Sequence, residues 1–392
     1  MDRVAGITST GSKRPAALFG AAGESLSLRM TRSSGCRVWD SEGREYLDYL
    51  MGLGAVALGY GHPEVTRAVT EAAEQGVIGP LPPVLEEAVA SDLCRAIPWL
   101  ERVRFLKTGA DAVAAAVRLA RVVTGRDAVL GCGYHGWHDW CQTAEGRGVP
   151  ASTRALYREV PFNDAARTRE MIRAAGDRLA AVVFEPVILE PPTPEWIAVL
   201  RAETLRAGAI LIADEIKTVC RLAAGGACER FGIRPDLVVM GKAIANGFPL
   251  AAVAGRADVM DAVSRTWISS TLASETVSLA AARATLTVMT EEKVPGHLTR
   301  VGTRLLAGLH ALAARHEAVV ARAAGVPEMC FLEYRDEPQS GRVALACAER
   351  GLLFKRSAYN FVSLAHDEAI VDRTIGILDE ALSVVGEEKG RG

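Results

Sequence analysis

Four groups of polar residues directly follow apolar runs in the sequence, and their side chains could do chemistry together. Thr108-Gly109-Ala110 follows RVRFLK, Glu185 follows LAAVVF, Asp214 ends ILIAD, and Lys242 follows LVVMG. In parallel sheets, ligand sites lie beyond the carboxyl ends of the strands. We therefore expect these groups to meet at one edge of a sheet.

Lys242 and Asp214 are the two residues whose surroundings could change their chemistry. A lysine at the mouth of a buried strand is partly desolvated, which lowers its pKa and makes a nucleophilic amine possible. The alternative is an ordinary exposed lysine. An acid after four apolar residues requires a cation, and a protonated heteroaromatic nitrogen would supply one. A buried salt bridge or a helix cap would satisfy Asp214 equally well.

The turn Thr108-Gly109-Ala110 joins a predicted strand to a predicted helix. Free N–H groups at the start of a helix favour a phosphate, although a plain helix cap is the alternative. A lysine, an acid and a phosphate turn together match the needs of pyridoxal phosphate (PLP). This cofactor requires a lysine for its Schiff base, an acid at its pyridinium nitrogen, a phosphate cradle and faces that enclose its ring.

The stretch GCGYHGWHDW, from Gly131 to Trp140, fits several patterns. Its glycines spell a dinucleotide fingerprint, but no amphipathic helix follows them. His135 and His138 lie three residues apart but have no convincing third metal ligand, so we expect no metal and assign both to hydrogen bonds within the loop. Tyr134 offers a flat face for stacking on the cofactor, and the glycines would let the backbone approach it.

Strand-like and helix-like segments alternate through the middle of the chain. Apolar runs such as AILIAD alternate with amphipathic segments such as ADAVAAAVRLARVVTG, which ends at Gly125. This alternation predicts an α/β domain with a mostly parallel sheet over residues 60–284. Residues 1–59, with a predicted hairpin in RVWDSEGREYLDYL, and residues 285–392 would together build a smaller α+β domain.

The overall composition excludes several classes of partner. A formal net charge of -2 gives no general attraction for nucleic acid or an anionic membrane. No apolar run approaches the roughly 20 residues of a membrane helix, and the N-terminus has no apolar core of a secretory signal. The eight cysteines are scattered and form no C-x-x-C, which favours reduced thiols in the cytoplasm.

Long ordered motifs give the chain a resemblance to a known family. The segments RFLKTGADAVAAAVRLARVVTGR, YHGWHD, DEIKT and PDLVVMGKAIANGFPLAAVAGR stand in sequence order. They resemble the phosphate turn, the ring-stacking segment, the aspartate motif and the lysine motif of the class III, fold-type-I aminotransferases, near the glutamate-semialdehyde aminomutase group. The resemblance runs from about Asp40 to Thr374.

The resemblance implies a role for each matching residue. Lys242 would form the Schiff base and carry the proton, and Asp214 would hold the pyridinium nitrogen. Ile216 and Tyr134 would enclose the ring. The remaining matches line the cofactor site: Thr108, Gly109 and Ala110 at the phosphate, Glu185 at the side, and Thr271, which would reach the phosphate of the second subunit. The family pattern thus implies a homodimer with shared active sites.

Departures from the family pattern bear on the substrate. The usual Ser-Gly-Thr turn ends in Ala110, Lys217 occupies a position that is often neutral, and Glu275 replaces the common asparagine. The arginine that many relatives use for a substrate carboxylate has no clear counterpart, with Lys355 and Arg356 as the nearest candidates. Glu275, Glu185 and Asp111 would make the entrance acidic, which would suit a polycationic substrate.

The segments WISSTLASE and GGACERFGIRPDLVVMGKAIANG resemble the corresponding sequences of aminotransferases of aminoglycoside biosynthesis. The leading hypothesis is therefore a PLP-dependent aminotransferase that acts on an amino or keto sugar, with glutamate as amino donor. A PLP-dependent aminomutase, epimerase or dehydratase is the first alternative. A nicotinamide-dependent oxidoreductase built on Gly131–Gly136 and a non-catalytic homologue are the others.

Overall fold

The computed structural model describes residues 3–23, 29–143 and 147–390. Contacts divide the chain into two compact units, Pro63–Pro295 and a unit formed by Met1–His62 together with Gly296–Gly392. The expected boundary after residue 284 is wrong, because it would cut helix α11 (Thr276–Glu291), which packs along α3 (Pro63–Gln75). The larger unit therefore keeps the whole of α11.

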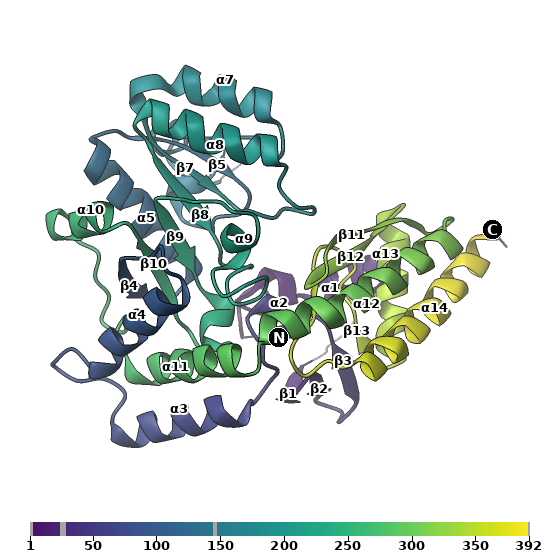
Figure 1. Ribbon diagram of the computed structural model, residues 1–392. Coiled ribbons are helices and arrows are strands. Elements are labelled where there is room, and N and C mark those ends of the chain that lie inside the picture. Colours follow the sequence, from purple (N-terminus) through teal and green to yellow (C-terminus); the bar gives the residue numbers. More distant parts are fainter. Residues whose placement is uncertain (1–2, 24–28, 144–146, 391–392) are drawn as a thin grey trace. The chain divides into compact units, whose positions relative to one another are not determined.

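The larger unit is built on one seven-stranded sheet (Figure 1). Its strands, in spatial order, are β4 (Arg102–Leu106), β10 (Ala251–Gly255), β9 (Leu237–Met240), β8 (Ile210–Asp214), β7 (Leu179–Phe184), β5 (Ala128–Cys132) and β6 (Tyr157–Glu159). Strand β10 runs antiparallel to both of its neighbours, and the remaining pairs are parallel. The expected α/β fold with a mostly parallel sheet is confirmed.

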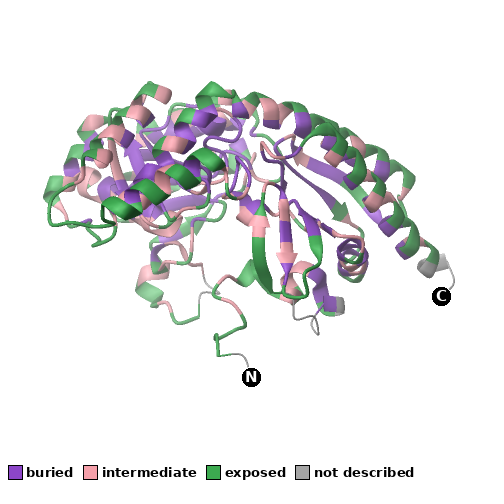
Figure 2. Ribbon diagram, turned by 90° about the horizontal axis from the view of Figure 1, so that it is seen from below, coloured by how far each residue is buried: buried purple, intermediate pink, exposed green. Residues whose placement is uncertain are grey.

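Helices cover both faces of this sheet, as the buried central strands in Figure 2 indicate. Successive residues of β7 belong to different cores: Ala181 and Val183 pack with α5 (Gly109–Thr124), whereas Val182 and Phe184 pack with α8 (Pro194–Ala207). Because side chains alternate along a strand, a sheet covered on both faces needs continuously apolar strands. The remaining helices of the unit are α4 (Val84–Ala96), α6 (Ala151–Arg154), α7 (Ala165–Ala175), α9 (Gly226–Arg230) and α10 (Ala257–Met260).

The ends of α5 and α8 follow from local sequence. Thr108 caps α5, and Thr193 caps α8 by accepting a hydrogen bond from the N–H of Trp196. Both helices end at a glycine in the left-handed conformation, Gly125 with φ 67° and Gly208 with φ 63°. A residue without a Cβ adopts this conformation without strain, so the stop expected at Gly125 is confirmed, and Gly208 ends α8 in the same way.

The smaller unit joins the two ends of the chain through one sheet. The expected hairpin forms β2 (Arg37–Asp40) and β3 (Glu45–Asp48), and β13 (Leu352–Leu353) pairs in parallel with β3. The other elements are β1 (Met30–Ser34), β11 (Val320–Val326), β12 (Met329–Tyr334), β14 (Asn360–Phe361), α1 (Pro15–Phe19), α2 (Met51–Gly54), α12 (Val294–Arg315), α13 (Glu337–Glu349) and α14 (Glu368–Gly390). Across the described ranges, the search for a helix with the length and apolar character of a transmembrane span finds none.

Candidate active site

A cavity of about 370 Å³ lies at the edge of the seven-stranded sheet where five strands end. Strands β5, β7, β8 and β9 run parallel, and β4 runs in their direction because two antiparallel pairings separate it from β9. Their carboxyl ends therefore share one edge. The cavity is lined by the expected residues Thr108, Gly109, Ala110, Tyr134, Glu185, Asp214, Ile216 and Lys242.

Lys242 is the first residue of a short helical turn that follows β9 and Gly241. Its backbone φ of 49° is a strained conformation for a residue with a side chain, a feature that clusters at functional sites. The pKa of Lys242 is lowered to about 8, chiefly by burial, and the neighbouring ammonium group of Lys217 acts in the same direction. A substantial fraction of the amine is therefore neutral near physiological pH, as a nucleophile or base requires.

Asp214 is buried at the end of β8 and is held by two partners. Its Oδ2 lies 2.9 Å from Nδ1 of His135, and its Oδ1 accepts a hydrogen bond of 3.2 Å from the N–H of Ile216. The ring of His135 is fully buried. Sequence reasoning treated His135 as a residue that only bonds within its loop, and this was wrong because the bond to Asp214 spans 79 positions.

The phosphate turn is the N-terminus of α5. Thr108 and Asp111 cap the helix reciprocally: the Thr108 hydroxyl oxygen accepts from the Asp111 N–H at 3.2 Å, and the Asp111 carboxylate accepts from the Thr108 N–H at 3.1 Å. Within the described ranges, the N–H groups of Gly109 and Ala110 have no acceptor among the hydrogen bonds of the chain. They face a cavity at the positive end of a helix dipole, which fits an anion.

Gly109 is needed because the turn packs closely against Ile216. A Cβ at position 109 would lie 2.5 Å from Cδ1 of Ile216, far inside van der Waals contact. Ile216 is thereby held at the wall of the cavity, where the resemblance expects one face of a flat ring. Tyr134 and Trp137 are exposed aromatic residues on the loop after β5 that also line the cavity.

The glycines of GCGYHGWHDW serve packing of this loop against the protein. Gly133, with φ 107°, leaves room for the side chain of Glu185, because an added Cβ would lie 2.8 Å from Cγ of that residue. Gly136, with φ 99°, leaves room in the same way for Ala110 at 2.6 Å. A dinucleotide fingerprint would open a helix here, whereas only a single 3-10 turn, Asp139–Cys141, follows in the described part.

The entrance acids are paired, so the expected acidic entrance is wrong. Glu185 forms an ion pair with Lys217, and its other oxygen accepts the N–H of Tyr134 at 2.6 Å. Asp111 belongs to the cap of α5. Lys217 therefore offsets the charge of Glu185, Asp111 accepts from the N–H and hydroxyl of Thr108, and the cavity carries lysines as well as carboxylates.

Glu275 has its own partner, Lys107, whose Nζ lies 2.6 Å from its carboxylate. It also caps α11 by accepting from the N–H groups of Val277 and Ser278. Burial by itself would raise the pKa of Glu275, but the hydrogen bonds from Lys107 and Ser278 outweigh burial and lower it. Glu275 therefore stays ionised as part of a fixed pair.

Other residues singled out in the sequence have different positions. Glu215, next to Asp214, is fully buried and accepts the N–H groups of Ala227 and Cys228 at the start of α9. Thr271 is exposed on the segment before α11 and does not line the cavity of its own chain. A search of the described residues for three or more His, Cys, Asp or Glu side chains arranged around a metal ion finds none.

The two candidates for the missing arginine are engaged inside the smaller unit. Lys355 donates to the carbonyl of Ala358, and Arg356 pairs with Glu337 at 2.9 Å and also donates to the hydroxyl of Ser340. Their charges already have partners there.

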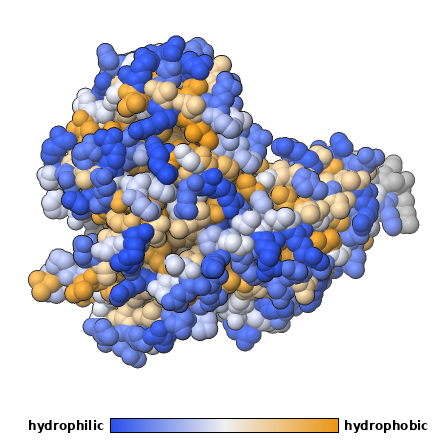
Figure 3. Space-filling view, in the orientation of Figure 1, coloured by the Kyte–Doolittle hydropathy of each residue, from blue (hydrophilic) through white to orange (hydrophobic). Residues whose placement is uncertain are grey.

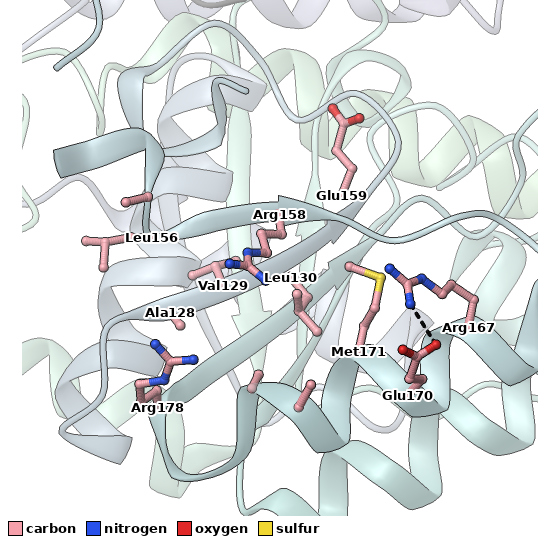
Figure 4. A pocket seen from close by; sticks show the side chains of 13 residues that line it. Ala128, Val129, Leu130, Leu156, Arg158, Glu159, Arg167, Glu170, Met171 and Arg178 are labelled. Carbon is pink, nitrogen blue, oxygen red and sulfur yellow. Dashed lines mark ion pairs between the residues drawn. The ribbon is translucent and has the colours of Figure 1, made fainter. Parts of the chain in front are cut away.

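A second hollow of about 390 Å³ lies on the larger unit beside the edge strand β6 (Figure 4). It is lined by the early part of β5 and by α7, away from the carboxyl ends of the strands. Its charged side chains are solvent-exposed, and Arg167 forms an ion pair of 2.6 Å with Glu170. This hollow brings together none of the expected site residues.

The model of the aminotransferase class-III family matches residues 19–384. This chain belongs to the class-III aminotransferases. The curated relatives include the glutamate-1-semialdehyde 2,1-aminomutases of Thermomicrobium roseum, 35% identical over 96% of this chain and 95% of that protein, and of Neisseria gonorrhoeae, 33% identical over 98% of both.

Solved structures of other proteins have the same fold. The FumI protein of Sphingopyxis sp. MTA144, determined in its PLP internal aldimine form, has a TM-score of 0.87 and 28% identity over 92% of this chain and 89% of its own. A glutamate-1-semialdehyde aminomutase of Pseudomonas aeruginosa has a TM-score of 0.81 and 25% identity over 91% of this chain and 88% of its own. The chain is a PLP-dependent enzyme of this family.

The cavity of this class-III enzyme fits PLP by its own geometry. A partly neutral lysine, a buried carboxylate and two N–H groups without internal acceptors line one cavity, and an aliphatic wall at Ile216 lies between them. The N–H groups would therefore serve the phosphate of PLP, the carboxylate its pyridine nitrogen, and the lysine its aldehyde carbon.

Proposed function

We propose that this enzyme transfers an amino group from an amino acid to a keto sugar, or acts at the amino group of an amino sugar. The main evidence for the proposed catalysis is that Lys242 and Asp214 line the same cavity as the N-terminus of α5. The sugar substrate and glutamate as donor are supported by two segments, WISSTLASE and GGACERFGIRPDLVVMGKAIANG. Their sequences resemble those of aminotransferases of aminoglycoside biosynthesis.

Each residue of the cavity would have a role that follows from its position. PLP, when bound, supplies an electron sink for the negative charge left when a proton is removed beside the substrate nitrogen. Lys242 would hold the cofactor covalently in the resting enzyme and, once released, would carry that proton on Nζ. Asp214, oriented by His135, would keep the pyridine nitrogen protonated, so that the ring attracts electrons.

The remaining residues would fix the orientation of the ring. The N–H groups of Gly109 and Ala110 would hold the phosphate, and the Thr108 hydroxyl remains committed to the helix cap. Ile216 would contact one face of the ring and Tyr134 the other. Glu185 would line the side of the ring together with Lys217.

A second candidate function is an aminomutase, in which one substrate both gives up and regains an amino group. The curated relatives that support it are glutamate-1-semialdehyde 2,1-aminomutases that align over nearly the whole chain. The epimerase and dehydratase alternatives would use the same lysine and acid but would leave the donor unconsumed.

Donor stoichiometry separates these functions. The purified protein, loaded with PLP, should show a visible absorption band that amino acids bleach and keto acids restore. It would then be incubated with glutamate and a set of keto sugars, and 2-oxoglutarate and aminated sugar would be counted. One keto acid per aminated sugar supports transamination, whereas isomerised product without keto acid supports the aminomutase. A protein that binds PLP without a visible band would exclude both.

We further propose that the enzyme is a homodimer in the cytoplasm, with each site completed by Thr271 of a second copy. The loop between α3 and α4 presents three exposed apolar residues, Val77, Ile78 and Leu81, followed by the exposed Val84 at the start of α4, and projects at the lower left of Figure 3. Such exposed groups favour a covered interface. All eight cysteines have free thiols, which favours a reducing compartment. Light scattering of the purified protein tests the dimer.

A further inference from the structure

Three lysines line the same cavity, although the proposed chemistry uses only Lys242; Lys107 pairs with Glu275. The third, Lys217, follows Ile216 directly and is largely buried. Its ammonium group pairs with Glu185 and lies 3.4 Å from the carbonyl oxygen of Val187. Glu185 is itself fixed, because its other oxygen accepts the N–H of Tyr134 at 2.6 Å.

The charges around Lys242 come from every strand end that faces the cavity. Beside the Lys217–Glu185 pair stand Asp214 with His135, and Lys107 with Glu275, whose charges offset each other at 2.6 Å. Asp111 is held in the cap of α5, and the buried Arg221 lies behind the loop after β8.

Lys217 and Glu185 act on Lys242 with opposite sign. Burial is the largest cause that lowers the pKa of Lys242 to about 8, and the positive charge of Lys217 is the next. Glu185 and Asp214 oppose both effects, since a negative charge stabilises the protonated amine. The ion pair therefore places one charge of each sign in the cavity that Lys242 also lines.

We propose that Lys217 is a positioning residue whose charge acts on Lys242 and favours the neutral form of this nitrogen, and that Glu185 moderates the effect. The inference rests on the proposed role of Lys242 as the lysine that holds PLP. The charge of Lys217 would act in the same direction on the lysine amine and on an imine formed with the cofactor, because the protonated form of each carries its positive charge at the same nitrogen.

The holoprotein allows a direct test, because the visible band of PLP changes when this nitrogen loses its proton. The absorption spectrum would be titrated with pH for the wild type and for Lys217→Met, and the midpoint should rise by about one pH unit in the variant. Glu185→Gln should lower the midpoint. The pH profile of turnover would also be measured with one amino donor. The pH at which the rate falls on the acidic side should shift in the same direction as the spectroscopic midpoint in each variant.

Three further variants separate the effect of charge on the midpoint from any effect of a changed structure. Lys217→Arg keeps the charge and should keep the wild-type midpoint to within a few tenths of a pH unit. The double variant Lys217→Met, Glu185→Gln removes both charges and should return towards the wild type, even if one single variant folds poorly. Lys293→Met is the matched control, because Lys293 is exposed at the end of α11 and does not line the cavity.

The inference is supported if the midpoint shifts in opposite directions in Lys217→Met and Glu185→Gln and stays at the wild-type value in Lys217→Arg. Unchanged midpoints, or shifts of the same sign in Lys217→Met and Glu185→Gln, overturn it. A protein with no visible band at all would instead contradict the proposed function, so the two failures are distinguishable.

Discussion

The active-site cavity and the hollow beside β6 have similar volumes, about 370 and 390 Å³, and both contain charged side chains. They differ in how far those charges are removed from water. The side chains of Glu185 and Asp214 in the cavity are 6% and 3% exposed, whereas Arg167 and Glu170 in the hollow are 52% and 65% exposed. Charges in water are screened and contribute little, but buried charges change the protonation of their neighbours.

This difference follows from the direction of the strands. Polar residues at the carboxyl ends of β5, β7, β8 and β9 converge on one cavity, where Glu185, Asp214 and the side chain of Lys242 are largely buried. The hollow beside β6 lies against the early part of β5 and the outer face of α7, where side chains reach solvent. The contrast predicts large effects of substitution in the cavity and small ones in the hollow.

Replacing Lys242 by alanine should have the largest effect. The variant lacks the amine that would hold PLP and carry the proton, so turnover should fall by about 10³-fold or more. The visible band of the bound cofactor should disappear in the same variant, as an absorption spectrum would record. Normal turnover in this variant would contradict the assignment of the site.

Replacing Asp214 by asparagine should have the next largest effect. Asparagine retains the size but removes the charge opposite His135 and the pyridine nitrogen, so kcat should fall by about 10²–10³-fold, as when one preorganised polar partner is lost. The measurement is kcat at saturating PLP, with circular dichroism as the control for folding. A rate close to that of the wild type would show that the buried charge has no part in catalysis.

Replacing Gly109 by alanine should weaken cofactor binding while leaving the chemistry intact. The new Cβ would lie 2.5 Å from Ile216 and push that side chain into the space of the ring. A cost of about 1–3 kcal/mol for such overpacking corresponds to a rise of about 5- to 150-fold in the Kd of PLP. Fluorescence titration of apoprotein would measure it, and unchanged affinity would place the ring elsewhere.

Replacing Arg167 by alanine should have the smallest effect. The variant loses an exposed ion pair with Glu170, so the free energy of unfolding should change by about 0.5 kcal/mol or less and turnover should stay unchanged. Denaturant titration and a standard activity assay test this prediction. A clear loss of activity would mean that the hollow is a functional site, and the contrast drawn above would fail.

The fold and the residues of the candidate site could be predicted from the sequence because both leave local signals. Continuous apolar runs such as ILIAD predict strands covered on both faces, and the glycines at 125 and 208 stop helices because of their conformational freedom. The short edge strand β6 was missed, since the three residues YRE carry no apolar pattern. The antiparallel direction of β10 was also beyond sequence reasoning, because an apolar strand gives no sign of its direction.

The sequence by itself determined which residues could react: a lysine, an acid and a helix N-terminus, each placed at the end of an apolar run. Only the tertiary structure decided how their charges are paired. Lys107 meets Glu275 across 168 positions and His135 meets Asp214 across 79, so an apparently acidic entrance becomes a set of ion pairs. These pairings depend on the order of the strands in the sheet, which is set by contacts between distant segments and leaves no trace in local sequence.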